Sequence, residues 1–150
     1  NRPLQIVTNS LPVANLICSS ANIDLVVIGG YVHTRSGTVQ GNYADEMLKT
    51  LNVRRAMLSV ADVSQRGLFN SNLLQVNTQR AMMQAADEVI VLADSTKFGH
   101  QSLAHVCELG DVDHYVVDDQ LPAEWQARIN NNGAQLHLAN VVQQATKVDT

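Results

Sequence analysis

The stretch EVIVLADSTKFG, residues 88–99, joins an apolar run to a polar loop. A short apolar run bounded by turn residues is typical of a strand buried in a parallel sheet. An acid, two hydroxyls, a lysine and a glycine then follow: Asp94, Ser95, Thr96, Lys97 and Gly99. In open parallel sheets, ligands bind beyond the carboxyl ends of the strands. The stretch therefore predicts a strand over 88–94, followed either by an ordinary loop or by the edge of a binding site.

Similar apolar runs recur along the chain, with helical patterns between them. The runs predict strands over 4–9, 23–30, 55–61, 88–94, 112–119 and 134–140. Apolar residues at helical spacing predict helices over 10–21, 43–52, 72–87 and 122–133. We expect loops over 31–42 (with a short edge strand at 38–40) and over 62–72, a short helix or turn at 101–109, and no assignable element after residue 140. This alternation predicts an α/β fold, an open and mostly parallel sheet with helices on both faces, in a single Rossmann-like domain spanning 1–150.

The composition restricts the class of protein. The chain has 150 residues, 45% hydrophobic and 16% charged, which suits one globular domain with its own core. Its longest apolar runs are about six residues, whereas a membrane span needs roughly 20. The first residues, NRPLQIV, lack the pattern of a signal peptide. We therefore expect a soluble, cytoplasmic protein without membrane contact.

The charge distribution and the spacing of histidines and cysteines exclude further classes of protein. The net charge is −4, and the ten Lys and Arg are scattered instead of forming the basic patch of a nucleic-acid binder. The five histidines and two cysteines show no zinc spacing, so we predict neither a metal nor another cofactor. We expect Cys18 and Cys107 to be two buried thiols in a reducing compartment.

Small or polar residues follow most of the predicted strands. In chain order they are Thr8-Asn9-Ser10, Gly29-Gly30, Asp62, Asp94 to Lys97, and Asp118-Asp119. Because the carboxyl ends of parallel strands meet at one edge, these groups predict a site for a small polar molecule. Lys97 would neutralise an anion such as a phosphate, and Ser10 lies at a predicted helix N-terminus that favours negative charge.

Each of these features also has an ordinary structural explanation. A loop lysine is usually solvated, and a Gly-Gly pair after a strand is usually a turn. Asp94 is equally suited to capping the loop that follows it. An enzymatic alternative assigns Asp62 as a base and Lys97 as a phosphate ligand in the isomerisation of a sugar phosphate.

Several motifs, in this order and spacing, resemble one known family. They are VTNSLPVANLI (7–17), VVIGG (26–30), RSG (35–37), GLFNSN (67–72), RAMM (80–83) and LADSTKFG (92–99). Together they resemble the C-terminal effector domain of DeoR-family bacterial transcriptional repressors, over about residues 4–120. The family typically has Asp-Ser-Ser-Lys-Phe-Gly where this chain has DSTKFG.

The resemblance implies a fold similar to ribose-5-phosphate isomerase, but a sensor instead of an enzyme. It implies a phosphorylated sugar or related metabolite as effector, operator DNA bound only through an N-terminal helix-turn-helix absent from this chain, and a homo-oligomer, either a dimer or a tetramer. An aldose–ketose isomerase on the same fold is the alternative. The implied effector-binding residues are Asn9, Ser10, Gly29, Gly30, Arg35, Asn72, Asp94, Ser95 and Lys97, to which we add Asp62.

The chain departs from the family pattern at three places. The upstream strand and its Asp-x-Gly-Thr-Thr loop are absent, which suggests a fragment. The segment SVADVS, residues 59–64, replaces a glycine-rich loop, so Asp62 is either a specificity feature or a cap that replaces a backbone contact. Phe69 and Gln75 replace the more common residues of the GLFNSNLLQVN segment, which leaves the effector's identity open.

Overall fold

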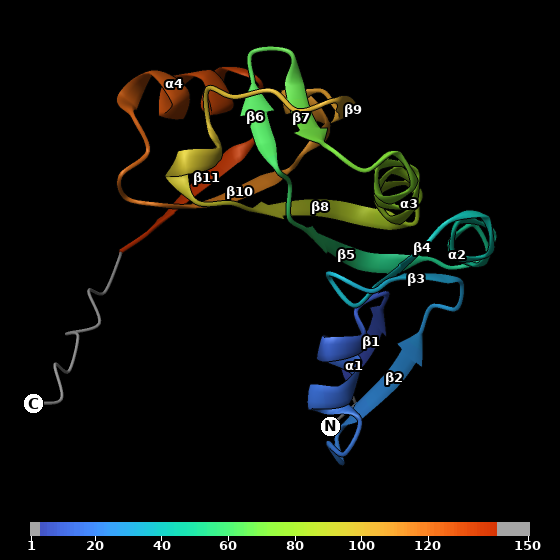
Figure 1. Cartoon of the computed structure of the whole chain (residues 1–150). Coiled ribbons are helices and arrows are strands. Elements are labelled where there is room, and N and C mark those ends of the chain that lie inside the picture. Colours follow the sequence, from blue (N-terminus) through green and yellow to red (C-terminus); the bar gives the residue numbers. More distant parts are fainter. Residues whose placement is uncertain (1–3, 141–150) are drawn as a thin grey trace, which may run out of the picture.

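The computed structural model describes residues 4–140 and shows a mixed α/β fold (Figure 1). Its elements are β1 (Leu4–Thr8), α1 (Leu11–Ile17), β2 (Ile23–Val27), β3 (Tyr31–His33), β4 (Thr38–Gln40), α2 (Asn42–Leu48), β5 (Val53–Leu58), β6 (Asp62–Ser64), β7 (Gly67–Asn70), α3 (Leu73–Gln84), β8 (Ala86–Leu92), β9 (Ala104–Cys107), β10 (His114–Asp118), α4 (Ala123–Asn131) and β11 (Gln135–Ala139). Short 3₁₀ turns lie at Ser95–Lys97 and Leu109–Asp111.

The main sheet has four parallel strands in the order β11-β10-β8-β5. A second parallel sheet contains β1 and β2, and the antiparallel pair β3-β4 follows it in the chain. Helices α3 and α4 flank the main sheet (Figure 1). The predicted class, an open α/β fold of the Rossmann type, is therefore confirmed.

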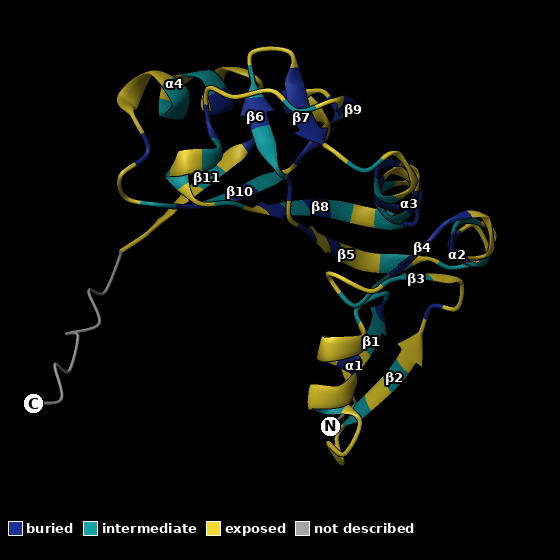
Figure 2. Ribbon diagram, viewed as in Figure 1, coloured by how far each residue is buried: buried dark blue, intermediate teal, exposed yellow. Residues whose placement is uncertain are grey.

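The main core lies on one face of the four-stranded sheet. Val91 and Tyr115 are register partners on neighbouring strands and are fully buried, as is Ile129 of α4. The Tyr115 hydroxyl donates a hydrogen bond of 2.9 Å to the carbonyl of Leu109, which satisfies its only polar group inside this core. A smaller core joins β2, β4 and α2 to α3, and Figure 2 shows both as dark segments.

Strands form in the predicted loop 62–72 and in 101–109, which the sequence predicts to be a short helix or turn. Residues 62–72 include the antiparallel hairpin β6-β7, and residues 101–109 include β9, which pairs with β7. Leu68 and Phe69 are buried in this added sheet. The hairpin turns at residues 65–66, and Gly67, the first residue of β7, has a φ of 113° that other residues rarely adopt. Such short strands form because the main sheet gives their apolar residues a surface to cover, which is a tertiary effect.

The first helix is shorter than predicted, and this changes the environment of one cysteine. Helix α1 ends at Ile17 and Cys18 is its C-cap, so the prediction of a buried Cys18 is wrong: this thiol is exposed. Cys107 is buried as expected, and burial raises the pKa of its thiol to about 12. Over residues 4–140, no helix is long and apolar enough to cross a membrane.

Candidate functional site

Asn9 and Ser10 hold the β3-β4 hairpin against the end of β1. The side-chain amide of Asn9 donates to the backbone carbonyl of Val39 (2.9 Å), and the backbone carbonyl of Asn9 accepts from the Val39 amide (2.7 Å). Ser10 is the N-cap of α1, where its hydroxyl accepts from the amide of Val13 (3.3 Å). Both side chains therefore already have structural partners.

The two glycines after β2 differ from each other. Gly29 is exposed, and a Cβ placed there would meet no atom within 4 Å. Gly30 has a φ of 148°, and a Cβ there would lie 3.1 Å from the carbonyl oxygen of Gln40. Close packing thus explains why residue 30 is a glycine, whereas the backbone at Gly29 leaves room for a ligand to approach. Arg35 is exposed in the turn between β3 and β4.

Asn72 connects the N-terminal region to α3. It is the N-cap of that helix, and its Oδ1 accepts from the amides of Leu74 (3.0 Å) and Gln75 (3.3 Å). Its Nδ2 donates to the Oε1 of the buried Gln40 on β4 (3.4 Å). A cap of this kind contributes about 1 kcal/mol to stability, so Asn72 has a structural role whether or not it contacts a ligand.

The loop after β8 is held by two aspartates. Asp94 caps the 3₁₀ turn by accepting from the Thr96 amide (3.0 Å) and hydroxyl. The Ser95 amide donates to Oδ2 of Asp118, at the end of the neighbouring strand β10 (2.6 Å). Lys97 is half-buried and its ammonium makes no ion pair within residues 4–140. The loop is thus fixed through its backbone while its cation stays available.

Asp62 lies beside this loop. It is half-buried on β6, and its Oδ2 accepts a hydrogen bond from the hydroxyl of Ser102. Its neighbour Val63 forms a parallel bridge with Phe98 and accepts from the Gly99 amide (2.8 Å). These backbone bonds place the strand carrying Asp62 next to the loop carrying Lys97.

The structure therefore gathers the ten candidate residues into groups. Asp94, Ser95 and Lys97 share one loop, and Asp62 lies on the strand bridged to it. Asn9, Ser10, Gly29 and Gly30 surround the ends of β1 and β2, with Asn72 linked to them through Gln40. Arg35 is exposed in its turn, and within the described chain its side chain makes no hydrogen bond or ion pair to the other nine.

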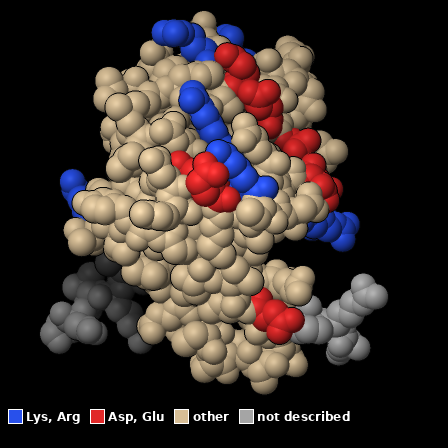
Figure 3. Space-filling model, turned by 90° about the vertical axis from the view of Figure 1, so that its right-hand side faces the viewer, with Lys and Arg blue, Asp and Glu red and all other residues tan. Residues whose placement is uncertain are grey.

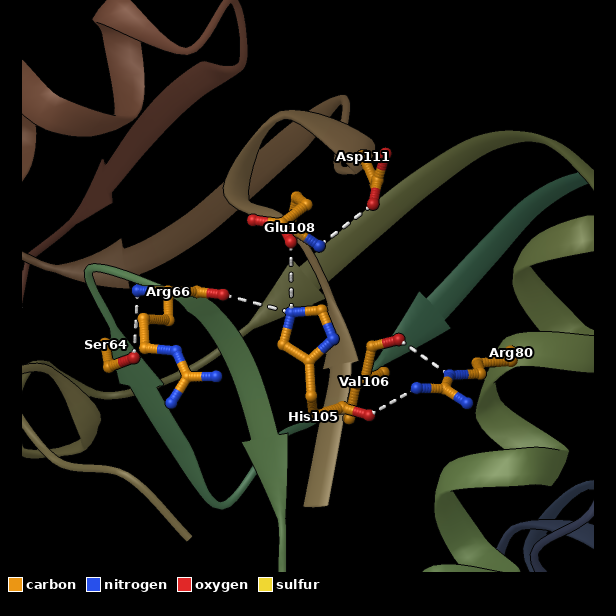
Figure 4. Close-up of polar contacts among 7 residues, drawn as sticks. All are labelled: Ser64, Arg66, Arg80, His105, Val106, Glu108 and Asp111. Carbon is orange, nitrogen blue, oxygen red and sulfur yellow. Dashed lines mark hydrogen bonds and ion pairs between the residues drawn. The ribbon is translucent and has the colours of Figure 1, made fainter. Parts of the chain in front are cut away.

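Two hollows lie outside these groups. One, of about 320 Å³, is lined by Arg66, His105 and Glu108, where β9 meets the β6-β7 turn (Figure 4). There the His105 Nε2 lies 3.0 Å from the Arg66 carbonyl oxygen, and the guanidinium of Arg80 binds the His105 carbonyl (2.7 Å). A smaller hollow, of about 160 Å³, lies between α2 and α3. Neither is lined by a candidate residue, and the polar contacts of the first serve to hold β9 in place.

Charges of both signs are interleaved on one face of the molecule. On the face shown in Figure 3, basic and acidic side chains lie side by side instead of forming a patch of one sign. Lys49 pairs with Glu46 (2.6 Å) and Arg128 with Glu124 (3.3 Å). No group of His, Cys, Asp or Glu within residues 4–140 is arranged to hold a metal ion.

Sequence reasoning missed two residues that bind candidate residues: Asp118, which accepts from the Ser95 amide, and Ser102, which donates to Asp62. Asp118 follows a predicted strand but is not among the ten candidates, and no sequence pattern points to Ser102. Both act through side-chain bonds to distant residues, 23 and 40 positions away. Only the pairing of β10 with β8 brings Asp118 to the loop, so its position after a buried strand was the one available clue.

The hydrogen bond to Ser95 predicts a measurable titration of Asp118. The Ser95 amide, and to a lesser extent that of Gln120, holds the pKa of this carboxyl below its ordinary value of 3.8. Because the folded-state pKa is lowered, the stabilisation is present above the ordinary value and is lost as pH falls through the lowered one. We expect the Ser95 amide NMR shift to titrate with a midpoint below 3.8. In Asp118→Asn this titration should vanish; a midpoint at or above 3.8 in the unsubstituted chain would contradict the assignment.

The domain has an open α/β fold in which polar loops follow the parallel strands, the position at which such sheets commonly bind ligands, and comparison with known proteins identifies the family. The model of the DeoR C-terminal sensor domain matches residues 1–119, and this chain belongs to that family. The resemblance seen in the motifs is thereby confirmed. The family and the relatives below are transcriptional regulators, so the chain is a regulatory domain and the isomerase alternative is not supported.

Three relatives illustrate the similarity. The chain is 30% identical over 135 residues to the HTH-type transcriptional regulator IolR of Bacillus subtilis, covering 89% of this chain and 54% of that protein. It is 26% identical to the putative aga operon transcriptional repressor of Escherichia coli O157:H7 (87% and 49%) and 27% identical to the L-fucose operon activator of Haemophilus influenzae (83% and 50%). The chain thus spans about half the length of these relatives.

Proposed function

We propose that this sensor domain binds a phosphorylated sugar or a related metabolite at the loop after β8. The observation that carries the proposal is the arrangement of this loop: Asp94 and Asp118 fix its backbone, while the Lys97 ammonium makes no ion pair in the described chain. A fixed loop with an available cation suits an anionic ligand, because little ordering is needed when the ligand binds. Asp62 and Ser102, on the adjacent segment, offer oxygen atoms for sugar hydroxyls.

The remaining candidate residues extend this site toward β1 and β2. The open backbone at Gly29 admits a close ligand, whereas Asn9, Ser10, Gly30 and Asn72 shape the surrounding loops. Arg35 would contribute only if the β3-β4 turn folded over the ligand. We therefore assign Lys97 the direct contact with the phosphate and the others supporting roles.

The whole protein is proposed to be a regulator of carbohydrate metabolism. The names of two relatives refer to operons, and the third is called an HTH-type regulator. These names support DNA binding through a helix-turn-helix domain outside these 150 residues. On the face of the described chain shown in Figure 3, acidic and basic side chains alternate instead of forming the basic patch that suits DNA. We further propose a cytoplasmic homo-oligomer, since closed symmetry matches repeated operator sites. The relatives include both a repressor and an activator, so the proposal covers both repression and activation of transcription.

The experiment is a thermal-shift titration of the full-length regulator with ribose 5-phosphate, fructose 6-phosphate and glucose 6-phosphate. A ligand that binds only the native state raises the apparent stability. Lys97→Ala should weaken binding of the active compound by roughly 10- to 100-fold, since a charged hydrogen bond is worth about 1.5–3 kcal/mol.

Lys49→Ala is the matched control. That lysine pairs with Glu46 on α2 and should leave binding unchanged. An unaltered effector response in Lys97→Ala would refute the assigned role of Lys97, and the absence of any shift with the unsubstituted regulator would refute the proposed effector class.

A further inference from the structure

The chain has one Asn-Gly pair, Asn132-Gly133, and it lies on the surface where α4 ends. In such a pair the backbone nitrogen of the glycine can attack the side-chain amide carbon of the asparagine, because glycine has no Cβ to hinder the approach. A Cβ placed at Gly133 would meet no atom within 4 Å, so the surroundings leave room for the backbone to rearrange. The pair therefore has the composition and exposure that this intramolecular attack requires.

The folded turn keeps the two reacting groups from joining. The Gly133 amide donates to the carbonyl of Asn130 (3.0 Å), and Nδ2 of Asn132, the leaving group, donates to the carbonyl of Arg128 (2.8 Å). The ψ of Asn132 is 6°, which eclipses the Gly133 nitrogen with the backbone nitrogen of Asn132. Closing a five-membered ring requires the Gly133 nitrogen to be eclipsed with the Cβ of Asn132 instead. The reaction therefore has to wait until the last turn of α4 opens.

Opening this turn disturbs no buried side chain. Residues 130–133 are exposed, and the buried residues Ile129 and Ala134 lie just outside them. The backbone amide of Asn132 donates to the carbonyls of Arg128 and Ile129 (3.2 and 3.1 Å), within the same turn. Exposed hydrogen bonds at the ends of elements open at free energies far below that of global unfolding. The reactive geometry is therefore reached by fraying of the helix end, while the domain stays folded.

We propose that Asn132 is a site of spontaneous deamidation, and that fraying of the last turn of α4 sets its rate. The Gly133 nitrogen loses its proton and forms a bond to Cγ of Asn132, while the bond from Cγ to Nδ2 breaks. Nδ2 takes up a proton and leaves as ammonia, and a succinimide ring remains. Water, the one co-reactant, then opens the ring. Opening at Cγ gives aspartate, and opening at the backbone carbonyl gives isoaspartate, in which the main chain runs through the former side chain.

Both products disturb the junction of α4 with β11. Each removes the donor that Asn132 gives to the carbonyl of Arg128, and each places a carboxylate at the C-terminal end of the helix, where the helix dipole is negative. Isoaspartate also lengthens the main chain between Ile129 and Ala134, which are both buried. The last turn of α4 or the start of β11 must then shift. We therefore expect the product chain to fray more readily there than the original chain.

Timed incubation of the full-length regulator at mildly alkaline pH, followed by peptide mass spectrometry, tests the site. Asn130 and Asn131 are internal controls, because both are exposed in the same turn but neither precedes a glycine. Asn132 should exchange its amide for an acid far sooner than either neighbour. In guanidinium chloride, which unfolds the chain, Asn132 should convert roughly tenfold faster, a factor that corresponds to an opening free energy of about 1.4 kcal/mol. Conversion of all three residues at one rate would overturn the assignment of the site.

Amide hydrogen exchange tests the role of fraying. The factor by which folding slows exchange of the Gly133 amide should equal the factor by which it slows deamidation, because the same opening exposes both. Equal deamidation rates in the folded and unfolded regulator would overturn this role, and so would complete resistance of the folded regulator.

Gly133→Ala tests the ring closure. Its positive φ of 87° strains an alanine and so favours opening, which by itself would speed the reaction. Conversion at Asn132 should nevertheless fall to that of Asn130, in the folded and in the unfolded regulator, because the added methyl group hinders the attacking nitrogen. Undiminished conversion in this variant would show that no succinimide forms. These measurements need no effector, so their outcome is independent of the proposed function.

Discussion

Replacing Gly67 with alanine is expected to lower the free energy of unfolding by roughly 3–5 kcal/mol, from a steric clash added to backbone strain. Gly67 has a φ of 113° at the start of β7. A Cβ there would lie 2.1 Å from the carbonyl oxygen of Cys107 and 2.9 Å from Nε2 of His105. The first of these atoms is backbone in β9, so relief requires the β7-β9 pairing to open. Urea unfolding measures the loss.

Gly133→Ala is the matched control for this prediction. Gly133 also has a positive φ, 87°, but a Cβ there would meet no atom within 4 Å. This variant isolates the conformational cost and should lose only about 1 kcal/mol. Equal losses at Gly67 and Gly133 would show that β9 does not approach β7 as closely as described.

The second large effect is expected at Gln79, a buried amide on α3. Its Nε2 donates to the carbonyl of Ser59 (2.7 Å), and its Oε1 accepts from Nδ2 of Asn70 (3.2 Å). Gln79→Leu keeps a similar volume but removes the hydrogen-bond partner of Asn70 Nδ2, in a residue that is only 7% exposed. An unsatisfied buried group costs about 1–3 kcal/mol, so with both bonds lost we expect a decrease of roughly 2–3 kcal/mol in the free energy of unfolding.

Gln84→Leu provides the comparison, because Gln84 is exposed on the last turn of the same helix. Its substitution should change stability by less than about 0.5 kcal/mol. Similar effects at the two positions would mean that the Gln79 amide does not connect α3 to Ser59, after β5, and to Asn70, at the end of β7. Because those segments lead to Asp62 and Asn72, Gln79→Leu should also weaken effector binding in the full-length regulator.

The parallel framework was predictable because its signals are local. Apolar runs such as 88–94 and 112–119 are bounded by polar or turn residues, and β8 and β10 form at these places. Pro122 and Gly133 mark the ends of α4 in the same way. The motifs around LADSTKFG were sufficient to indicate the sensor family, which the family match confirmed.

The strands β6, β7 and β9 were not predictable for a physical reason. Each is four residues or shorter. The β6-β7 hairpin is local, but β7 also pairs with β9, far away in the chain, as Leu68 does with Cys107. The exposure of Cys18 was missed because the expected helix continued beyond Ile17. Asp118, which anchors the Lys97 loop, is marked in the sequence only by its position after a strand, and no local pattern indicates that Ser102 binds Asp62.

By itself, the sequence determined the α/β class, the order of the parallel strands along the chain, and the polar loops that follow them, since periodicity and turn chemistry act over a few residues. Only the tertiary structure decided which of those loops meet, because strand order across a sheet depends on long-range pairing. It is this pairing that brings Asp118 to Ser95 and the strand of Asp62 to the loop of Lys97.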